Sequence, residues 1–478
     1  MPARPAPTCR RNFQLRPLFR RSSNQLLPYD HSTTSRFLSS SSNKEIHPST
    51  IAGLEFRVRE LERLSQLQPL TKYDLQNLAW PLLSDCASLP FTPNENAYAR
   101  RSGISTQQDL HERAKLCSRI LEVCLKEVEG RRVFLWDWLQ KSAESTSVLS
   151  DETTGKFSPT SFWNETPHPT KEMYSLVFSA LRHVVESCSS FSIKSTDAMI
   201  LMESSAQQAS SLLSLMEDEY SSDSAFIHAY NSHVQKGSYT LLRMGAVLPD
   251  VRNYSEVIRT WAQCIDGSIL RESNTFSRDG AFQKRLTLEA TAMKSMMELL
   301  EAMEEDLYEN FSPNVSQRKR PPPDRICYNI ILASMARQIN PSLYEMRLVL
   351  QRMMERVKYE LERPENEEED EAKAEHIYDY AMTFFPDVFS YNALIEARAN
   401  RSAMFASDQQ QLLRQQSDSQ RSQHHSAWQQ GNTGNLSHRK KRFTSSEEEA
   451  LLAEQILDEM CHLSTVPVRP NIYSYNGT

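Results

Sequence analysis

Apolar residues recur along this chain at intervals of three and four, the spacing that places them on one face of an α-helix. This pattern is clearest in residues 114–128, and a similar stripe begins at Leu54. We therefore expect residues 45–146 to be helical, either as one degenerate repeat or as a separate helical cap. Trp136 and Trp138 have apolar neighbours in this region, and we expect them to be buried anchors.

After residue 167 the chain repeats one pattern, a proline followed five residues later by a tyrosine and then by a small polar residue. Proline cannot continue a preceding helix, and the Asp or Asn that follows most of these prolines can cap the next helix. The tyrosine and the apolar residues three and four positions later form the buried face of that helix. The tyrosines of the pattern are Tyr174, Tyr254, Tyr328, Tyr391 and Tyr475.

A second apolar stripe follows each complete copy of the pattern, for example Met346, Val349, Leu350 and Met353. One unit is therefore expected to form two consecutive helices that pack as a hairpin and bury their apolar faces against neighbouring units. Glycine is scarce, with 11 residues in 478, and helix-forming residues dominate the composition. The expected fold class is all-α, built as a solenoid of helical-hairpin repeats.

The units are longer than those of ordinary helical repeats. Consecutive prolines of the pattern stand 63 to 84 residues apart, whereas helical repeats usually span about 33 to 47 residues. The excess lies in polar or charged inserts near residues 308–322, 362–375 and 401–445, which we expect to be disordered. Residues 147–166 are rich in Ser, Thr and Pro and are expected to form a linker. The array of residues 167–478 ends inside an incomplete unit.

The first 44 residues differ from the rest in composition. Residues 1–44 contain seven arginines and one lysine against the single acid Asp30, together with many serines. An Arg-rich, Ser-rich and acid-poor leader is typical of a disordered organellar transit peptide, whereas the alternative is a disordered basic tail. The density of arginine and the short length favour a mitochondrial location over a plastid one.

Charge and motifs narrow the class of function. The formal net charge of −7 provides no global basic field for nonspecific nucleic-acid binding. The eight cysteines contain no CxxC pair, which favours free thiols over a zinc site or a disulfide scaffold. HExxH, GxxxxGK[ST] and GxGxxG motifs are absent, and no apolar run is long enough to span a membrane. We therefore expect a binding protein with no cofactor, no metal and no membrane span, rather than an enzyme.

The stretch PDVFSYNALIEA, followed after an insert by EEEALLAEQILDEM and then VRPNIYSYN, resembles the pentatricopeptide repeat (PPR) family. The resemblance extends from about residue 167 to the end, is strongest after residue 321, and departs from the family in the long inserts. It implies a superhelix of hairpins similar to tetratricopeptide repeats, in which each unit reads one base of single-stranded RNA through two or three side chains.

In that family, the residue directly after the tyrosine and the last residue before the next unit contact the base edge. Asn and Ser can offer a donor and an acceptor to a base, whereas an ionised Asp only accepts. The first position is occupied here by Ser175, Ser255, Asn329, Asn392 and Asn476. The second position is occupied by Asp250, Asp324, Asp387 and Asn471.

By the family's pairing rule, three of these pairs resemble readers of a purine, with G favoured, then U and then C. They are Ser255 with Asp324, Asn329 with Asp387, and Asn392 with Asn471. The alternative is that the Asp and Asn residues only cap helices and that the Ser and Asn residues only tolerate solvent. Phosphate contacts could come from Arg318, Lys319, Arg320 and Arg325, and from the basic run 439–442.

The expected function is that of an organellar RNA-binding protein that reads single-stranded RNA through its helical repeats and acts in transcript processing, stability or translation. One alternative is a protein-binding helical scaffold, for example a factor associated with the organellar ribosome. Another is the repeat region of a larger RNA-processing nuclease. The expected partners are single-stranded organellar RNA and proteins of the organellar ribosome or of RNA processing.

Overall fold

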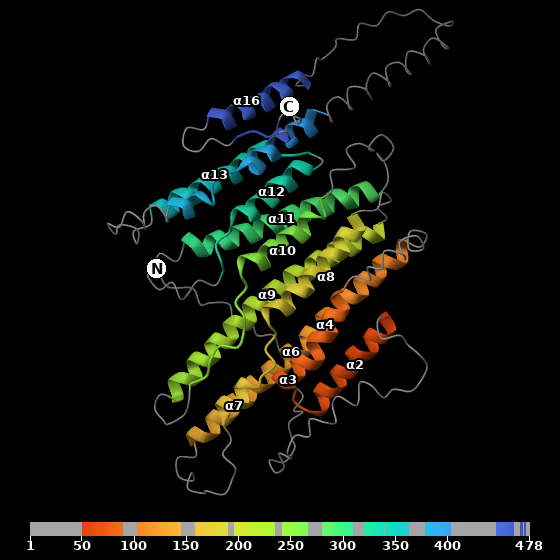
Figure 1. The fold of residues 1–478 in the computed structure, drawn as a ribbon, viewed down its shortest axis with the longest axis vertical. Helices are drawn as coiled ribbons and strands as arrows, with labels where there is room; N and C mark the ends of the chain where they lie inside the picture. The colour runs from red at the N-terminus through yellow and green to blue at the C-terminus, as the bar shows by residue number, and fades with distance from the viewer. Residues whose placement is uncertain are drawn as a thin grey trace, which may run out of the picture. The chain divides into compact units, whose positions relative to one another are not determined.

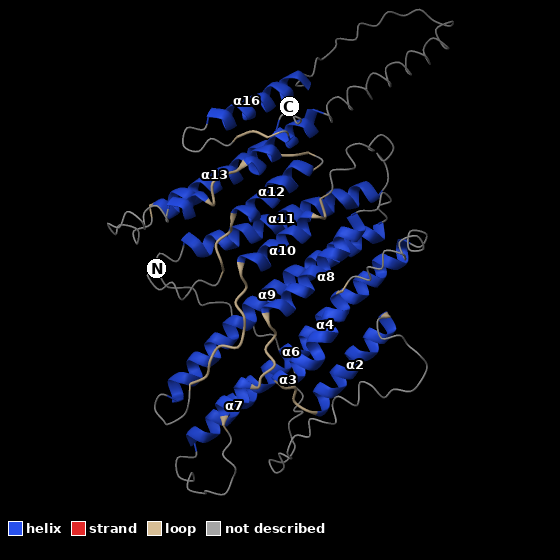
Figure 2. Cartoon of the chain, viewed as in Figure 1, coloured by secondary structure: helices blue, strands red, loops and turns tan. Residues whose placement is uncertain are grey.

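The computed structural model describes residues 50–88, 103–144, 158–189, 196–234, 241–265, 280–308, 320–338, 340–362, 378–402, 446–462, 469–471 and 473–474. These residues belong to one compact unit of the chain, Pro48–Thr478. They form helices joined by loops and include no strand, which confirms the all-α class (Figure 2). The predicted leader and nearly all of the three predicted inserts lie outside the described residues.

The N-terminal region consists of several helices and one π-helical turn. In chain order they are α2 (Ile51–Leu67), α3 (Lys72–Asp74), the π-helical turn η1 (Leu75–Ala79), α4 (Trp80–Ala87) and the long helix α6 (Gly103–Glu144). The hydroxyl of Thr50 accepts from the backbone N–H of Gly53 at the start of α2. Leu54, Val58 and Leu61 are buried as the apolar stripe predicts. Both α2 and α4 pack against α6, which in turn packs against the first helix of the repeat region.

The expectation of buried anchors is wrong for Trp136, which is 36% exposed, while Trp138 is half-buried. Leu135 is the buried residue of this segment, since it stands seven positions after buried Val128 and so continues the same helix face. A tryptophan that is buried in this part of the chain is Trp163 of α7 (Pro159–Asn164), a helix that begins inside the expected linker.

Trp163 holds together a small apolar cluster separate from the main core. It packs with Leu135, Phe226 and Leu242, and its Nε1 donates to the carbonyl of Arg243 at 2.9 Å. The ring of His168 meets Trp163 edge-on with centroids 5.0 Å apart. Burial lowers the pKa of His168 to about 4, an effect that nearby Asp223 opposes.

The repeat region consists of consecutive helix pairs (Figure 1). The pairs are α8 (Lys171–Ser189) with α9 (Thr196–Val234), α10 (Val251–Ala262) with α11 (Gly280–Tyr308), and α12 (Arg325–Arg337) with α13 (Leu343–Leu361). The helical residues 388–402 and α16 (Ser446–His462) follow. We call each pair a unit. The first helix α10 contacts both α8 and α12, and the second helix α11 contacts α9, so successive units pack on one another.

The helices begin where the sequence predicts. Asp250 caps α10 by accepting from the backbone of Asn253, whose side chain accepts in return from the backbone of Asp250. Asp324 caps α12 by accepting from Cys327 N at 2.9 Å, and Ser342 caps α13. An N-terminal cap of this kind stabilises a helix by about 1 kcal/mol.

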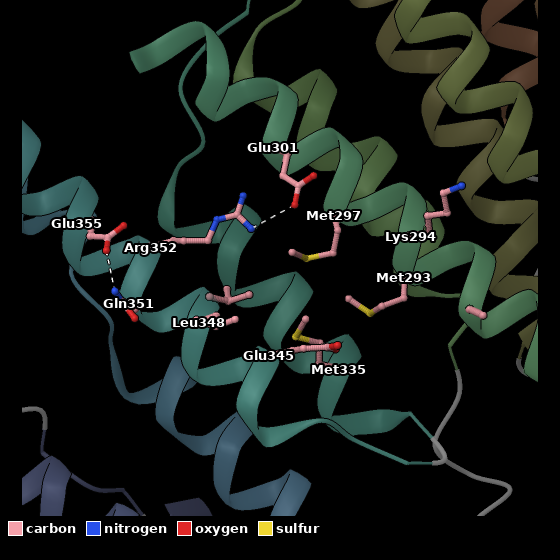
Figure 3. A pocket seen from close by; sticks show the side chains of 12 residues that line it. Met293, Lys294, Met297, Glu301, Met335, Glu345, Leu348, Gln351, Arg352 and Glu355 are labelled. Atoms are coloured by element: carbon pink, nitrogen blue, oxygen red, sulfur yellow. Dashed lines mark hydrogen bonds and ion pairs between the residues drawn. The ribbon is translucent and has the colours of Figure 1, made fainter. Parts of the chain in front are cut away.

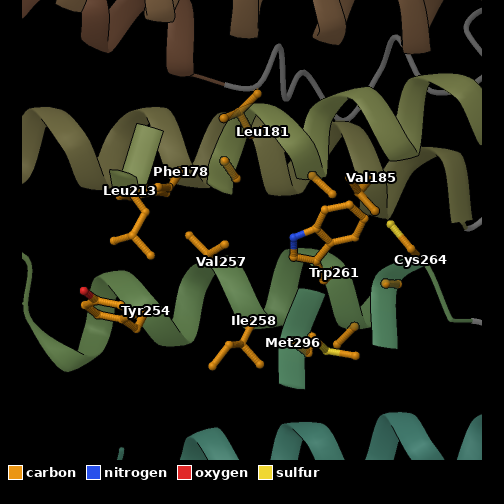
Figure 4. Close-up of a cluster of buried hydrophobic side chains, with 14 of the residues drawn as sticks. Phe178, Leu181, Val185, Leu213, Tyr254, Val257, Ile258, Trp261, Cys264 and Met296 are labelled. Atoms are coloured by element: carbon orange, nitrogen blue, oxygen red, sulfur yellow. The ribbon is translucent and has the colours of Figure 1, made fainter. Parts of the chain in front are cut away.

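The core runs without a break through the units, and Figure 4 shows the part of it around Trp261. Trp261 and Tyr254 of α10 meet Phe178 of α8, Leu213 of α9 and Met296 of α11 in the same cluster. The Nε1 of Trp261 donates to Ser210 Oγ at 2.8 Å, which satisfies the one polar atom of the ring. Full burial of such a side chain stabilises a fold by about 1.5–3 kcal/mol.

The pattern tyrosines also make a polar contact between units. Tyr328 of α12 donates to Glu304 of α11 at 2.7 Å, and the same carboxylate accepts from Arg352 Nε at 2.9 Å. In the preceding unit Tyr254 donates to Glu217 of α9, which accepts from Arg320 at 2.9 and 3.1 Å. A second helix is thus tied to the first helix of the next unit by a Tyr–Glu–Arg contact.

The described residues offer little other chemistry. They contain no helix that is both long and apolar enough to cross a bilayer, and no cluster of His, Cys, Asp or Glu among them has the form of a metal site. Burial raises the pKa of the thiol of Cys124 to about 12 and that of Cys188 to about 11, which keeps both thiols protonated. The remaining buried free cysteines are Cys86, Cys117, Cys264 and Cys327.

Candidate nucleic-acid interface

An open groove of about 480 Å³ runs across the first helices of three successive units. It is lined by residues of α10, of α12 and of the helical segment 388–402, and we call it the first-helix groove. Matching positions of neighbouring units face it together. Ile326 corresponds to Phe389 in the repeat pattern, and Asn329 corresponds to Asn392.

The structure brings two of the predicted pairs together. Nδ2 of Asn329 donates to Oδ1 of Asp387 in the next unit at 3.0 Å. Nδ2 of Asn392 donates to Oδ1 of Asn471 at 3.3 Å. The same contact thus recurs at two successive unit boundaries, between residues far apart in the sequence.

The capping role of the second position coexists with this contact. Oδ1 of Asp387 accepts from the backbone N–H groups of Phe389 at 3.0 Å and Ser390 at 3.1 Å. Oδ1 of Asn471 accepts in the same way from the N–H groups of Tyr473 and Ser474. One oxygen therefore caps a helix and also holds the asparagine of the preceding unit.

The two serines at the first position are bonded within their own helices. Ser175 Oγ donates to the carbonyl of Lys171 at 3.0 Å, and Ser255 Oγ donates to that of Arg252 at 2.9 Å. Ser255 is also buried. Ser175 and Ser255 therefore donate their hydroxyl protons within their own helices, whereas Asn329 and Asn392 donate to the next unit.

The corresponding carboxylates have other partners, since Asp250 pairs with Lys171 of α8 and caps α10, while Asp324 caps α12. Asn476, the last predicted contact, lies outside the described residues.

The sequence reasoning missed a set of exposed apolar side chains at one fixed position. Ile326 is 53% exposed, Phe389 66% and Tyr473 74%. Each stands three residues before the asparagine of its unit, and residues three apart share a helix face. Single exposed apolar residues are ordinary on protein surfaces. The signal in the sequence was that an apolar residue recurs three positions before the asparagine in these three units, outside the stripe of buried apolar residues.

The basic residues of the groove also differ from those expected. Arg259 and Arg337 line it, together with Glu396. The protein around Glu396 shields its carboxyl from water and so raises the pKa of that group, and Arg337 partly opposes this effect. Two of the arginines expected to contact phosphate are bonded to acids instead: Arg320 to Glu217, and Arg325 to Asp387 at 3.4 Å. The basic residues 318, 319 and 439–442 lie outside the described residues.

A second groove, of about 580 Å³, lies between α11 and α13 (Figure 3). Its apolar lining includes Met293, Met297, Met335 and Leu348, and we call it the methionine groove. Three glutamates line it against one lysine and one arginine, and that arginine, Arg352, is already paired with acids of α11. An excess of acid disfavours a polyanion.

A comparison of the chain with protein-family models, with curated proteins and with solved structures finds no match. The class of protein that the described residues define is an all-α protein of consecutive helix pairs. Its distinguishing feature is an open groove that equivalent asparagines from successive units line together.

Proposed function

We propose that this chain is a PPR-like α-solenoid that binds single-stranded RNA along the first-helix groove in an organelle, the mitochondrion. It acts through binding rather than catalysis, in transcript processing, stability or translation. One observation carries the proposal: Asn329 with Asp387, and Asn392 with Asn471, have the same geometry at successive unit boundaries. A chain that reads successive bases needs such a repeated contact.

The chemistry of the two pairs suits different bases. In the first pair, Oδ2 of Asp387 lies 3.4 Å from Nε of Arg325 and can only accept, which favours a base edge with a donor such as N3–H of uracil. In the second pair, Nδ2 of Asn471 can donate, which fits the N3 acceptor of cytosine. This assignment agrees with the U and C that the family resemblance implies for Asn329 and Asn392.

The neighbours of the asparagines suit the remainder of a nucleotide. Phe389 and Ile326 expose apolar surface beside them, and stacking of a base on an aromatic ring such as that of Phe389 contributes about 1–3 kcal/mol. Arg259 and Arg337 supply positive charge for phosphates along the same groove.

The test uses the full chain and short single-stranded RNAs that differ at one base. Asn471→Asp turns the second pair into a copy of the first, so we expect its preference to change from C to U, with salt-sensitive affinity throughout. Asp379→Asn is the matched control, because Asp379 is an exposed acid that does not line the groove. An unchanged base preference, or crosslinking in organelle extracts that reaches ribosomal proteins but no transcript, contradicts the proposal.

A protein-binding scaffold, such as a factor of the organellar ribosome, is the second candidate function. The methionine groove favours it, because flexible thioether side chains adapt to apolar partners. Leu348 is 40% exposed in this groove. If the scaffold function holds, Leu348→Asp removes crosslinks to proteins, whereas Asn329→Ala leaves those crosslinks intact.

A further inference from the structure

In each of the two pairs, a serine of the following unit also bonds to the asparagine of the preceding unit. Ser390 Oγ donates to Oδ1 of Asn329 at 2.6 Å, and Ser474 Oγ donates to Oδ1 of Asn392 at 2.5 Å. Both serines are fully buried and occupy the same position of their units. Each serine stands directly before the pattern tyrosine of its unit, Tyr391 or Tyr475, and not directly after it, so the family resemblance assigns no reading role to either.

Backbone N–H groups can only donate, and they therefore constrain which side-chain atom donates in the neighbouring hydrogen bonds. Oδ1 of Asp387 accepts backbone N–H groups, so the asparagine atom that faces it must be the amide nitrogen. Ser390 Oγ accepts the N–H of Asp387 at 3.1 Å, and its own proton faces Oδ1 of Asn329 at 2.6 Å, which is closer than Oδ1 of Asp387 at 3.2 Å. Ser474 accepts from Asn471 N in the same way, also at 3.1 Å.

We propose that Ser390 and Ser474 are positioning residues that fix the amide plane of Asn329 and Asn392, the asparagines that read the RNA. This inference rests on the proposed function. One hydrogen bond from Nδ2 lets the amide rotate about that bond, whereas a second bond at Oδ1 holds the plane. The remaining N–H and carbonyl lone pair then face the groove in a single orientation. A unit is thus made ready to read by the unit that follows it.

The chain contains its own comparison. At the position of Ser390, the two earlier units have Asn253 and Cys327. Asn253 exchanges hydrogen bonds with Asp250 of its own helix. The residues that these units would have to hold are Ser175 and Ser255, which are bonded to their own helices. Serine therefore occurs at this position where the preceding unit presents an asparagine.

The first test removes one serine at a time from the full chain. Ser390→Ala is expected to speed side-chain amide exchange of Asn329 and leave Asn392 unchanged, as measured by NMR with ¹⁵N-asparagine. Ser474→Ala should do the reverse. Each variant should lower discrimination at one base about three- to tenfold, as expected when one side chain must be ordered on binding. Ser334→Ala is the control, since Ser334 is equally buried but donates to Ile330 of its own helix.

The second test builds the arrangement where it is missing. Ser255→Asn combined with Cys327→Ser places an asparagine and a serine around Asp324, and we expect a new slowly exchanging amide together with a preference for U at that unit. Unchanged amide exchange in both single variants and no protected amide in the double variant overturn the positioning role. If the amides respond as expected but the chain binds no RNA oligonucleotide, the positioning stands and the RNA function fails.

Discussion

At the scale of single residues, Asp387 shows how much of the site could be predicted. The spacing from Pro386 to Tyr391 places Asp387 in register with Asn329, so this pairing was accessible from the sequence. The role of Ser390 was not, because a helical serine can bond to its own backbone, as Ser255 does, or reach across a unit boundary. The choice depends on which side chain the neighbouring helix presents, and that is a property of the packing.

His168 leads to a prediction about pH. Burial depresses its folded-state pKa to about 4, below the value of about 6.5 for an unfolded chain. Above pH of about 6.5 the imidazole is neutral in both states and has no effect. As the pH falls from there towards 4, the unfolded chain binds a proton that the folded chain does not, so stability decreases. A tenfold difference in proton affinity corresponds to about 1.4 kcal/mol, so we expect a loss of about 2–3 kcal/mol by pH 4.

Denaturant unfolding of the His168→Gln variant at several pH values measures this effect. The difference in unfolding free energy between the variant and the natural chain should change between pH 6.5 and 4 and be constant above pH 7. His228→Gln is the control, since His228 is exposed on α9. Parallel pH profiles for the natural chain and the His168→Gln variant would rule out this role of His168.

At the scale of helices, the sequence reasoning identified the pattern tyrosines as packing residues but missed their hydroxyl partners. Tyr328 and Glu304 are on different helices and stand 24 residues apart in the sequence, so no local pattern links them. The starts of the helices were easier to predict, since Asp250 and Asp324 follow prolines. Capping depends on neighbours in the sequence, whereas the Tyr–Glu–Arg contact depends on how two units pack.

Tyr328→Phe tests that contact. The substitution keeps the ring but removes the donor to Glu304, a residue that is only 8% exposed. We expect a loss of about 1–2 kcal/mol in unfolding free energy, because a buried acceptor loses one of its partners. The measurement is chemical denaturation, with Tyr344→Phe as control because Tyr344 is 74% exposed. Equal stability of the two variants would contradict a stabilising role for the hydroxyl.

At the scale of the whole molecule, the all-α class could be predicted from the stripes and the scarcity of glycine. The small cluster around Trp163 could not, because its residues come from α6, α7, α9 and the loop before α10. Ser, Thr and Pro around α7 indicated a linker, and a helix of six residues is too short for apolar periodicity to reveal. The expectation for Trp136 failed for a related reason, since apolar neighbours alone do not determine which face of α6 is covered.

We expect Trp163→Ala to destabilise this small cluster without unfolding the main core. Loss of a large buried ring typically destabilises its surroundings by about 3–5 kcal/mol. Because the cluster is distinct from the core around Trp261, we expect faster hydrogen exchange in α7 and residues 241–250, with α10 and α12 still protected. Phe56→Ala is the control, since Phe56 on α2 is 51% exposed and is not part of this cluster. Loss of protection throughout the chain would mean that the two clusters unfold as one.

The hydrogen bonds of Ser390 also change where one repeat should be considered to end. A breakpoint at Pro386 cuts between helix pairs, yet it separates Asn329 from both Asp387 and Ser390. If a unit cut at that boundary were transplanted, its asparagine would bond to the capping residue of a new neighbour instead of to Asp387 and Ser390. The segment that can be exchanged intact is therefore offset from the helix pair by about one helical turn. Gene duplication and protein engineering would both preserve the contacts of Asn329 only by copying past Pro386 as far as Ser390.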